Sequence, residues 1–189
     1  MATQSSKDAT YKKLDVTCTS TDCKSNLHCF KLTQELRANL VPGQCRTCGA
    51  KLVDFERIAK CNSEDVQYTF QSLRYEMIRH HFWHVEIPER AVRHALRKGL
   101  MGLHEAARQR IGTSVGAAKP FRDGAQTPRE TSLSVNMIHL GQHATASCCR
   151  KCIEYWHGIP QGRPLTEKEV SYLTELVLMY IQERLPELR

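Results

Sequence analysis

Hydrophobic residues recur at helical spacing through the second half of the chain. Apolar positions lie three or four apart in residues 66–81, 100–111 and 170–185. This spacing is typical of an α-helix that turns one face toward a core. We therefore expect a mainly helical domain, with the last of these helices packed along its core.

Capping residues and helix breakers mark where several of these helices begin and end. Pro88 stands at a favourable first position for a helix that Gly99 closes. Thr166 and Glu169 have the spacing of a capping box at the start of the final helix. Residues 112–132 contain too much Gly and Pro for a long element, so we expect a functional or mobile loop there.

Two segments in the first third of the chain resemble each other around their cysteines. They are C-K-S-N-L-H-C-F (residues 23–30) and C-G-A-K-L-V-D-F (residues 48–55), and a further cysteine precedes each of them. Two knuckles that each supply two thiolates and lead into a strand make a zinc ribbon. The predicted zinc ligands, one pair from each knuckle, are Cys18, Cys23, Cys45 and Cys48. Cys29 is the alternative to the first of them.

The hydrophobic pattern also predicts some β-structure. Apolar and polar residues alternate from 133 to 137, so residues 133–140 are expected to form a short strand. The predicted fold class is α+β: a small N-terminal β zinc ribbon, then a mainly helical domain with one or two short strands. The predicted organisation is a flexible N-terminus over 1–16, the zinc ribbon over 17–62 and the helical domain over 63–189.

The densest chemistry lies in residues 141–160, G-Q-H-A-T-A-S-C-C-R-K-C-I-E-Y-W-H-G-I-P. No Gly or Pro interrupts residues 144–157, so we expect one helix there. On such a helix Cys152 shares a face with Cys148 and lies three residues from Cys149, which predicts a second metal site. The candidate ligands are the cysteines and histidines of this stretch: His143, Cys148, Cys149, Cys152 and His157.

The identity and role of this second site stay open in the sequence. Zinc suits mixed cysteine and histidine ligands. An iron–sulfur cluster is the alternative if a remote residue or a histidine completes the set. A second interpretation is a reactive thiol activated by Arg150 and the histidines. A third is structural, with the cysteines acting as small hydrophobic residues beside Trp156.

Composition and charge limit the classes of function. The chain has 189 residues, of which 41% are hydrophobic and 25% charged, a balance typical of soluble globular proteins. No apolar run approaches a membrane span, and the polar start does not resemble a signal peptide, so we expect a cytoplasmic protein without a membrane partner. In that compartment nine cysteines are expected to be metal ligands or reactive thiols rather than disulfides.

A formal net charge of +7 favours polyanionic partners, above all nucleic acid, although ordinary basic domains also carry such a charge. The candidate nucleic-acid contacts are basic residues of three segments: Arg90, Arg93, Arg97, Lys98, Lys119, Arg122 and Arg150. We predict a zinc-binding protein associated with DNA or RNA. The alternative is a metal-dependent enzyme acting on nucleic acid, a nuclease or a base-processing enzyme, for which the sequence identifies no catalytic residue.

From about Tyr75 to Arg184 the chain resembles a family of small bacterial proteins known only as a domain of unknown function. The resemblance implies a shared fold and site, and it brings no established activity. Because members of that family are generally shorter, the predicted ribbon would be an addition to their common core. The motifs that carry the resemblance are D-G-A-Q-T-P (123–128), G-Q-H-A-T-A-S-C-C-R-K-C (141–152), Y-W-H-G-I-P (155–160) and G-R-P-L-T-E-K-E (162–169).

Overall fold

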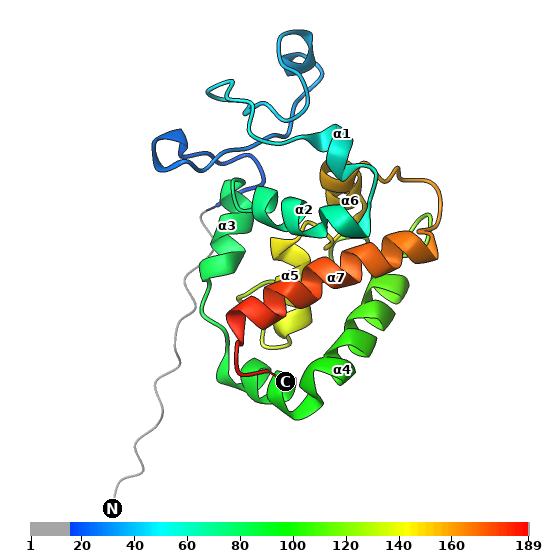
Figure 1. Ribbon diagram of the computed structural model, residues 1–189. Coiled ribbons are helices and arrows are strands. Elements are labelled where there is room, and N and C mark those ends of the chain that lie inside the picture. Colours follow the sequence, from blue (N-terminus) through cyan, green and yellow to red (C-terminus); the bar gives the residue numbers. More distant parts are fainter. Residues whose placement is uncertain (1–15, 189) are drawn as a thin grey trace, which may run out of the picture.

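The computed structural model describes residues 16–188, in which seven α-helices form a body that carries an N-terminal segment, residues 16–54 (Figure 1). Apart from residue 16, the predicted flexible N-terminus lies outside the described residues. No β-strand forms between residues 16 and 188, so the α+β prediction is wrong. The described part of the chain is mainly helical.

Seven helices and three short 3-10 turns follow one another along the chain. The helices are α1 (Phe55–Ile58), α2 (Val66–Leu73), α3 (Met77–His84), α4 (Glu89–Ser114), α5 (Met137–Ala144), α6 (Arg150–His157) and α7 (Glu167–Arg184). The 3-10 turns are η1 (Cys23–Ser25), η2 (Leu36–Ala38) and η3 (Ser63–Asp65). None of these described helices is both long enough and apolar enough to cross a membrane.

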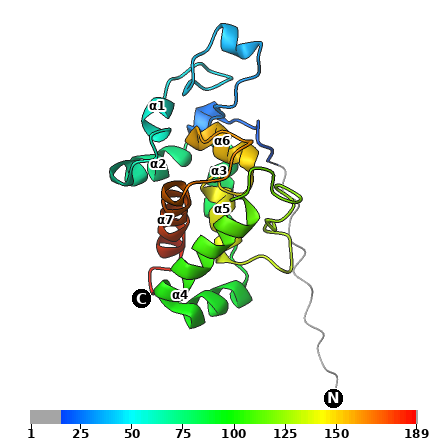
Figure 2. The ribbon, with the colours of Figure 1, turned by 90° about the vertical axis from the view of Figure 1, so that its right-hand side faces the viewer.

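Helix α7 crosses the helical body in Figure 1 and is seen nearly end-on, toward one side of the body, in Figure 2. It packs against α2, α4 and α5, and Leu173, Leu176 and Val177 on its inner face are fully buried. Thr166 and Glu169 form the capping box at its start, each side chain accepting a hydrogen bond from the other residue's backbone N–H. Both expectations for this helix, its start and its packing, are therefore confirmed.

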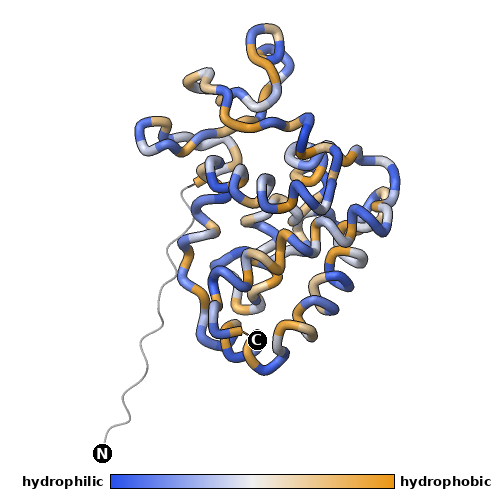
Figure 3. Tube along the Cα trace, viewed as in Figure 1, coloured by the Kyte–Doolittle hydropathy of each residue, from blue (hydrophilic) through white to orange (hydrophobic). Residues whose placement is uncertain are grey.

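Helix α4 consists of two arms that meet at Gly99. The backbone of Gly99 has φ 66° and ψ 173°, which glycine adopts readily and other residues do not. The bend is visible in Figure 1, and hydrophobic positions recur along the helices in Figure 3. The prediction of a helix closed by Gly99 and followed by another is confirmed.

Two segments expected to continue in one conformation do not. The helical pattern of residues 66–81 is divided between α2 and α3, because the backbone of the intervening turn bonds to the N-terminal segment. His28 N–H donates to the Tyr75 carbonyl at 2.7 Å, and Met77 N–H donates to the His28 carbonyl at 2.9 Å.

The expected strand over 133–140 is also wrong. The side chain of Asn136 caps α5 there by accepting from His139 N–H at 3.0 Å.

The N-terminal segment is not a β zinc ribbon, which corrects the prediction for residues 17–62. Its two cysteine turns each close with a single bridge, residue 22 with 27 and residue 44 with 51. The backbone of His28 then bridges to Glu76 of the helical body instead of pairing with the second turn. Because those backbone groups are already used, the strands of a ribbon do not develop.

Aromatic packing joins the segment to the helical body. Phe30 and Phe55, which occupy equivalent positions in the two similar cysteine segments, both contact Trp156 of α6. Their ring centroids lie 5.9 Å and 5.2 Å from that of Trp156. Trp156 is fully buried, so the segment and the helical body share one hydrophobic core.

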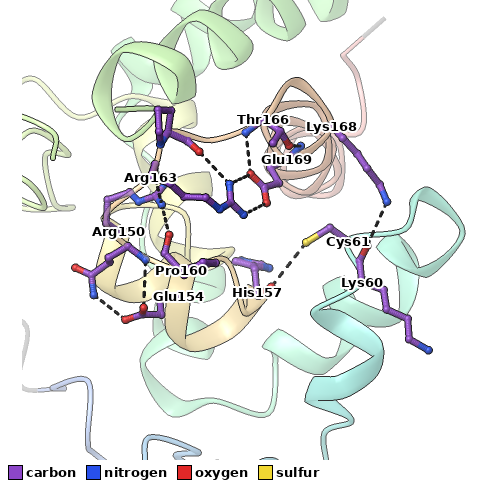
Figure 4. A network of polar contacts seen from close by, with 12 residues as sticks. Lys60, Cys61, Arg150, Glu154, His157, Pro160, Arg163, Thr166, Lys168 and Glu169 are labelled. Carbon is purple, nitrogen blue, oxygen red and sulfur yellow. Dashed lines mark hydrogen bonds and ion pairs between the residues drawn. The ribbon is translucent and has the colours of Figure 1, made fainter. Parts of the chain in front are cut away.

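A network of polar contacts holds the connection between α6 and α7 (Figure 4). The guanidinium of Arg150 donates to the carbonyl oxygens of Pro160 at 2.6 Å and Arg163 at 3.1 Å. Arg163 in turn forms an ion pair with Glu169 at 2.5 Å. The start of α6 is thereby tied to the start of α7, which fixes the helix that carries Cys152.

Candidate metal centres and the cavity beside them

The N-terminal segment gathers four potential metal ligands, whose ligand atoms all lie within 4.8 Å of one another. They are Cys23, His28, Cys45 and Cys48. Sγ of Cys23 lies 3.7 Å from Sγ of Cys45, and Sγ of Cys48 lies 3.6 Å from Nδ1 of His28. Three thiols and one imidazole form a donor set used by structural zinc sites. This group, called the four-ligand site below, can hold a metal ion.

Local backbone geometry prepares the second cysteine turn for a thiolate. Gly49 adopts φ 74° and donates its N–H to the Cys45 carbonyl at 2.9 Å, which closes the turn. The N–H of Thr47 points to Sγ of Cys45 at 3.5 Å. Burial opposes ionisation of Cys45, but backbone N–H groups around its sulfur outweigh it and lower its pKa to about 6.

His28 is a site residue that the sequence reasoning missed. It lies five residues after Cys23, a Cys-x4-His spacing that was the available signal. Its Nδ1 faces Cys48 while its Nε2 contacts the side chain of Asn26 at 3.0 Å, so a second contact orients the ring. The structure leaves Cys18 outside this group. Cys29 is buried and also outside it, and its thiol donates to the Cys18 carbonyl at 3.3 Å.

Three thiols of the central motif form a second group: Cys148, Cys149 and Cys152. They do not share a face of one helix, because α5 ends at Ala144 and α6 begins at Arg150. The prediction of an uninterrupted helix over 144–157 is therefore wrong. Two of the cysteines precede α6, and the third lies in its first turn, where the N–H of Cys152 donates to Sγ of Cys149 at 3.3 Å. We call this group the thiol triad.

Side chains within the motif interrupt the helix. The hydroxyl of Thr145 donates back to the Gly141 carbonyl at 2.8 Å, and Ala146 adopts φ 56°. Gln142 completes the turn: its carbonyl accepts from Ser147 N–H at 2.8 Å, and its side chain donates to the Ser147 carbonyl at 3.2 Å. These bonds replace the helical ones and bring the three thiols together.

The loop over residues 115–136 positions the triad from outside. The carboxylate of Asp123 accepts the Arg150 N–H at 3.0 Å, which caps the start of α6. The hydroxyl of Thr127 donates to the Cys148 carbonyl at 3.1 Å. The expected loop therefore contributes to the site, and its D-G-A-Q-T-P motif contacts the central motif directly.

A buried ion pair adjoins the triad. Arg79 and Glu76 are 2% and 1% exposed, with Nε of Arg79 2.9 Å from Oε2 of Glu76. Glu76 also accepts from the hydroxyl of Tyr155 at 2.8 Å and the indole N–H of Trp156 at 2.6 Å. Nη2 of Arg79 donates to Sγ of Cys152 at 3.4 Å. Hydrogen bonds from the other two thiols, followed by the charge of Arg79, hold the pKa of Cys152 well below its ordinary value.

The structure does not bring the two predicted histidine ligands into the triad. Nε2 of His143 lies 3.2 Å from the Thr127 carbonyl, and its ring stacks on Phe82 with centroids 4.6 Å apart. His157 is fully buried, with Nε2 3.0 Å from the Thr145 carbonyl. Burial lowers the pKa of each histidine to about 4, so both are neutral near pH 7.

A cavity of about 750 Å³ lies between the N-terminal segment and α6. Its lining includes Cys18 from the segment and Cys152 from the triad. The cationic residues of its wall are Lys31, Arg37, Arg79 and Lys151. The aromatic residues of its wall are Phe30, Phe55 and Tyr155. Because the wall combines apolar rings, positive charge and one thiol of the triad, this cavity is the candidate ligand-binding site.

The predicted nucleic-acid contacts occupy three different places. Arg90, Arg93 and Arg97 line a hollow of about 390 Å³ on the first arm of α4, and Lys98 lines its neighbour. The loop residues Lys119 and Arg122 are exposed. Arg150, by contrast, is 1% exposed and donates only to backbone carbonyls, so the structure gives it a positioning role.

Comparison with known proteins places the triad within a recognised sequence family. A family model described as a domain of unknown function (DUF4186) matches residues 67–182, from within α2 to within α7. The matched range contains Arg79 and the thiol triad, while the four-ligand site precedes it. No solved structure matches the chain.

Proposed function

The chain belongs to the DUF4186 family, and because that description names no activity, we propose from its own sites that it is a zinc-binding protein associated with nucleic acid. One observation carries the proposal: two separate groups of thiols, each able to hold a metal ion, lie on one basic chain. The two groups differ in the number of ligands, and that difference separates their roles.

The four-ligand site is proposed to be structural. Four protein ligands complete the tetrahedral coordination of zinc, which is the arrangement of structural sites. The segment that holds this site contains no strand, and its regular structure is limited to the short turns η1 and η2. Its core is therefore small, and metal binding would supply the folding free energy that such a core lacks. The bound ion would hold Phe30 and Phe55 in position against Trp156.

The thiol triad is proposed to hold the second zinc ion. Its three sulfur ligands lie at the wall of the cavity through Cys152, and Arg79 holds that sulfur in place. Zinc sites with three protein ligands and one open position are the catalytic type. This observation favours a second candidate function, a metal-dependent enzyme acting on nucleic acid, in which zinc would supply Lewis acidity.

Association with nucleic acid is supported by charge and its placement. The net charge is +7, and three arginines of α4 surround one hollow. Arginine side chains in such an arrangement attract phosphates, and the affinity falls steeply with salt because counterions are released. The loop residues Lys119 and Arg122 add exposed positive charge at another place on the chain.

The first test is metal content of anaerobically purified protein. Wild type is expected to carry two zinc ions, and Cys45→Ser and Cys152→Ser one each. Cys61→Ser is the matched control, because Cys61 is a buried thiol outside both groups. A single zinc ion in wild type, or iron instead of zinc, would contradict the proposal of two zinc sites.

The second test is binding of labelled DNA and RNA oligonucleotides. The affinity is expected to fall steeply with rising salt, and Arg93→Ala with Arg97→Ala should weaken binding. Arg108→Ala on the other arm of α4 serves as the control. Absence of binding at low salt would overturn the nucleic-acid part. Processing of the oligonucleotide that is lost in Cys152→Ser but kept in Cys61→Ser would establish the enzyme instead.

A further inference from the structure

We infer that the cavity between the N-terminal segment and α6 binds one nucleotide unit, with its base against the aromatic wall and its phosphate among the exposed cations. This inference rests on the proposed function and specifies the ligand class of the triad's own cavity. Helices α1 and α6, which border the cavity through Phe55 and Tyr155, lie in contact with each other (Figures 1 and 2).

The cavity has the size of a small-molecule site. Its volume of about 750 Å³ lies inside the range of roughly 300–1,000 Å³ over which proteins bind small ligands. Such sites combine an apolar surface with a few placed polar groups. A base, its sugar and one phosphate would fit this volume, whereas a duplex would not enter it.

The charge of the wall selects an anion. Lys31, Arg37 and Lys151 are exposed at the cavity, and no carboxylate among residues 16–188 forms an ion pair with any of them. Arg79 is excluded from this role because Glu76 already neutralises it. Glu154 is an acidic residue of the lining, and its side chain accepts from Gln161 at 2.7 Å. Glu154 keeps its negative charge, because the amide of Gln161 is neutral, but the three exposed cations outnumber it and can form strong, charge-assisted hydrogen bonds to a phosphate.

The apolar part of the wall selects a flat ring. Phe55 and Tyr155 are half-buried, and their ring centroids lie 6.0 Å apart with planes tilted by 37°. Tyr155 is held by its hydrogen bond to Glu76, so its ring is fixed before a ligand arrives. Aromatic side chains that stack on bases are a common basis of single-strand binding, whatever the base.

The two halves of this cavity come from different parts of the chain. Lys31, Arg37 and Phe55 precede the range that matches the family, whereas Lys151 and Tyr155 lie within it. The N-terminal segment, held by its four-ligand site, therefore completes the ligand site of the family core. Nucleotide binding should accordingly need both parts.

The experiment is calorimetric titration of the zinc-loaded full chain with adenosine and cytidine 5′-monophosphates. Saturable binding of one molecule per chain is expected for at least one of them. Adenosine, cytidine and ribose 5-phosphate, each lacking half of the ligand, should bind roughly tenfold more weakly or worse. Binding of ribose 5-phosphate as tight as that of the monophosphates would overturn the inference, because the base would then contribute nothing.

Variants locate the binding in the cavity. Arg37→Ala is expected to weaken monophosphate binding roughly tenfold, and Phe55→Leu at least roughly fivefold. Arg108→Ala makes the same change outside both the cavity and the proposed nucleic-acid surface of α4, and it should leave the affinity unchanged. If neither cavity variant weakens binding, or if Arg108→Ala weakens it equally, the inference is wrong. Circular dichroism of each variant verifies that it is folded.

A four-nucleotide single strand distinguishes the two sources of such a unit. Tighter binding of the strand than of the monophosphates, still weakened by Phe55→Leu, supports a strand segment as the ligand; equal binding supports a free nucleotide. No binding of either overturns the inference. Metal content and the binding of the labelled oligonucleotides, measured on the same samples, test the proposed function separately. If only the nucleotide inference fails, these two measurements still give the results that the proposed function predicts.

Discussion

Nη2 of Arg79 lies 3.4 Å from Sγ of Cys152, so one buried guanidinium joins the thiol triad to the interior of the protein. The same group pairs with Glu76 at 2.9 Å and donates to the His143 carbonyl at 2.5 Å. Glu76 in turn holds Tyr155 and Trp156. A single ion pair therefore links the triad, the aromatic wall of the cavity and the end of α5.

Replacing the buried arginine is expected to destabilise the protein strongly. Arg79→Ala leaves Glu76 buried without its partner, and breaking such a pair costs about 3–5 kcal/mol in the free energy of unfolding. Arg74→Ala breaks the ion pair between Arg74 and Glu183, in which the two side chains are 35% and 39% exposed. Because this pair is partly exposed to solvent, its loss should lower the free energy of unfolding by about 1 kcal/mol or less. Urea unfolding of the metal-loaded proteins measures both. Equal costs for the two variants would refute the linking role of Arg79.

The four-ligand site includes His28 and leaves Cys18 outside, and substitution of each residue tests that assignment. His28→Ala should carry one metal ion fewer per chain than wild type under the same chelator challenge, because a closed structural site then lacks one of its four protein ligands. His28→Cys should retain the ion, since a thiolate replaces the imidazole. Cys18→Ser should leave this ion in place, as the structure puts Cys18 outside the group. Loss of the ion in Cys18→Ser, with retention in His28→Ala, would show that Cys18 and not His28 is the ligand.

The cap that Asp123 provides for α6 should be measurable as stability. Asp123→Ala removes the carboxylate that accepts the Arg150 N–H, and loss of a helix cap costs about 0.5–2 kcal/mol. Because Cys152 lies in the first turn of that helix, a metal ion bound at the triad should also dissociate faster. Thermal unfolding and chelator-driven metal release test the two effects. Arg122→Ala, an exposed neighbour, is the control and should change neither.

The free energy of unfolding is expected to fall at acidic pH because His157 is buried in its neutral form. Its pKa is lowered to about 4 by burial, whereas an unfolded histidine titrates near 6.5. The unfolded chain therefore binds more protons between these values, and stability is lost as the pH falls from about 6.5 to about 4. The contribution is roughly 1.4 kcal/mol for each pH unit.

The matched measurement compares wild type with His157→Gln by urea unfolding across that pH range. The variant should show a shallower pH dependence by the amount given, because glutamine does not titrate. Gln67→Ala, which changes an exposed residue of α2 that does not titrate, should keep the wild-type slope. Metal release at low pH affects all three proteins alike, so the difference between them isolates the histidine. An identical slope in His157→Gln would disprove the assignment.

The sequence by itself determined those features that depend on neighbouring residues. The capping box of Thr166 and Glu169, the break at Gly99 and the apolar stripe of α7 all follow from local hydrogen bonding, glycine geometry and helical period. The similarity of the two cysteine segments also aligned Phe30 with Phe55, and the two residues are equivalent in the structure because both rings contact Trp156. Cysteines at short spacing likewise indicated where thiols would gather.

Only the tertiary structure decided which distant groups meet. The backbone of His28 bonds to the turn between α2 and α3 instead of a second knuckle, which removes the predicted ribbon and brings a histidine to three cysteines. Asp123 and Thr127, from a loop, hold the interrupted helix that forms the triad. Arg79 reaches Cys152 across 73 positions of the chain. Such partners are determined by competition among all buried polar groups for hydrogen bonds. The spacing of residues along the chain does not indicate which distant groups will pair.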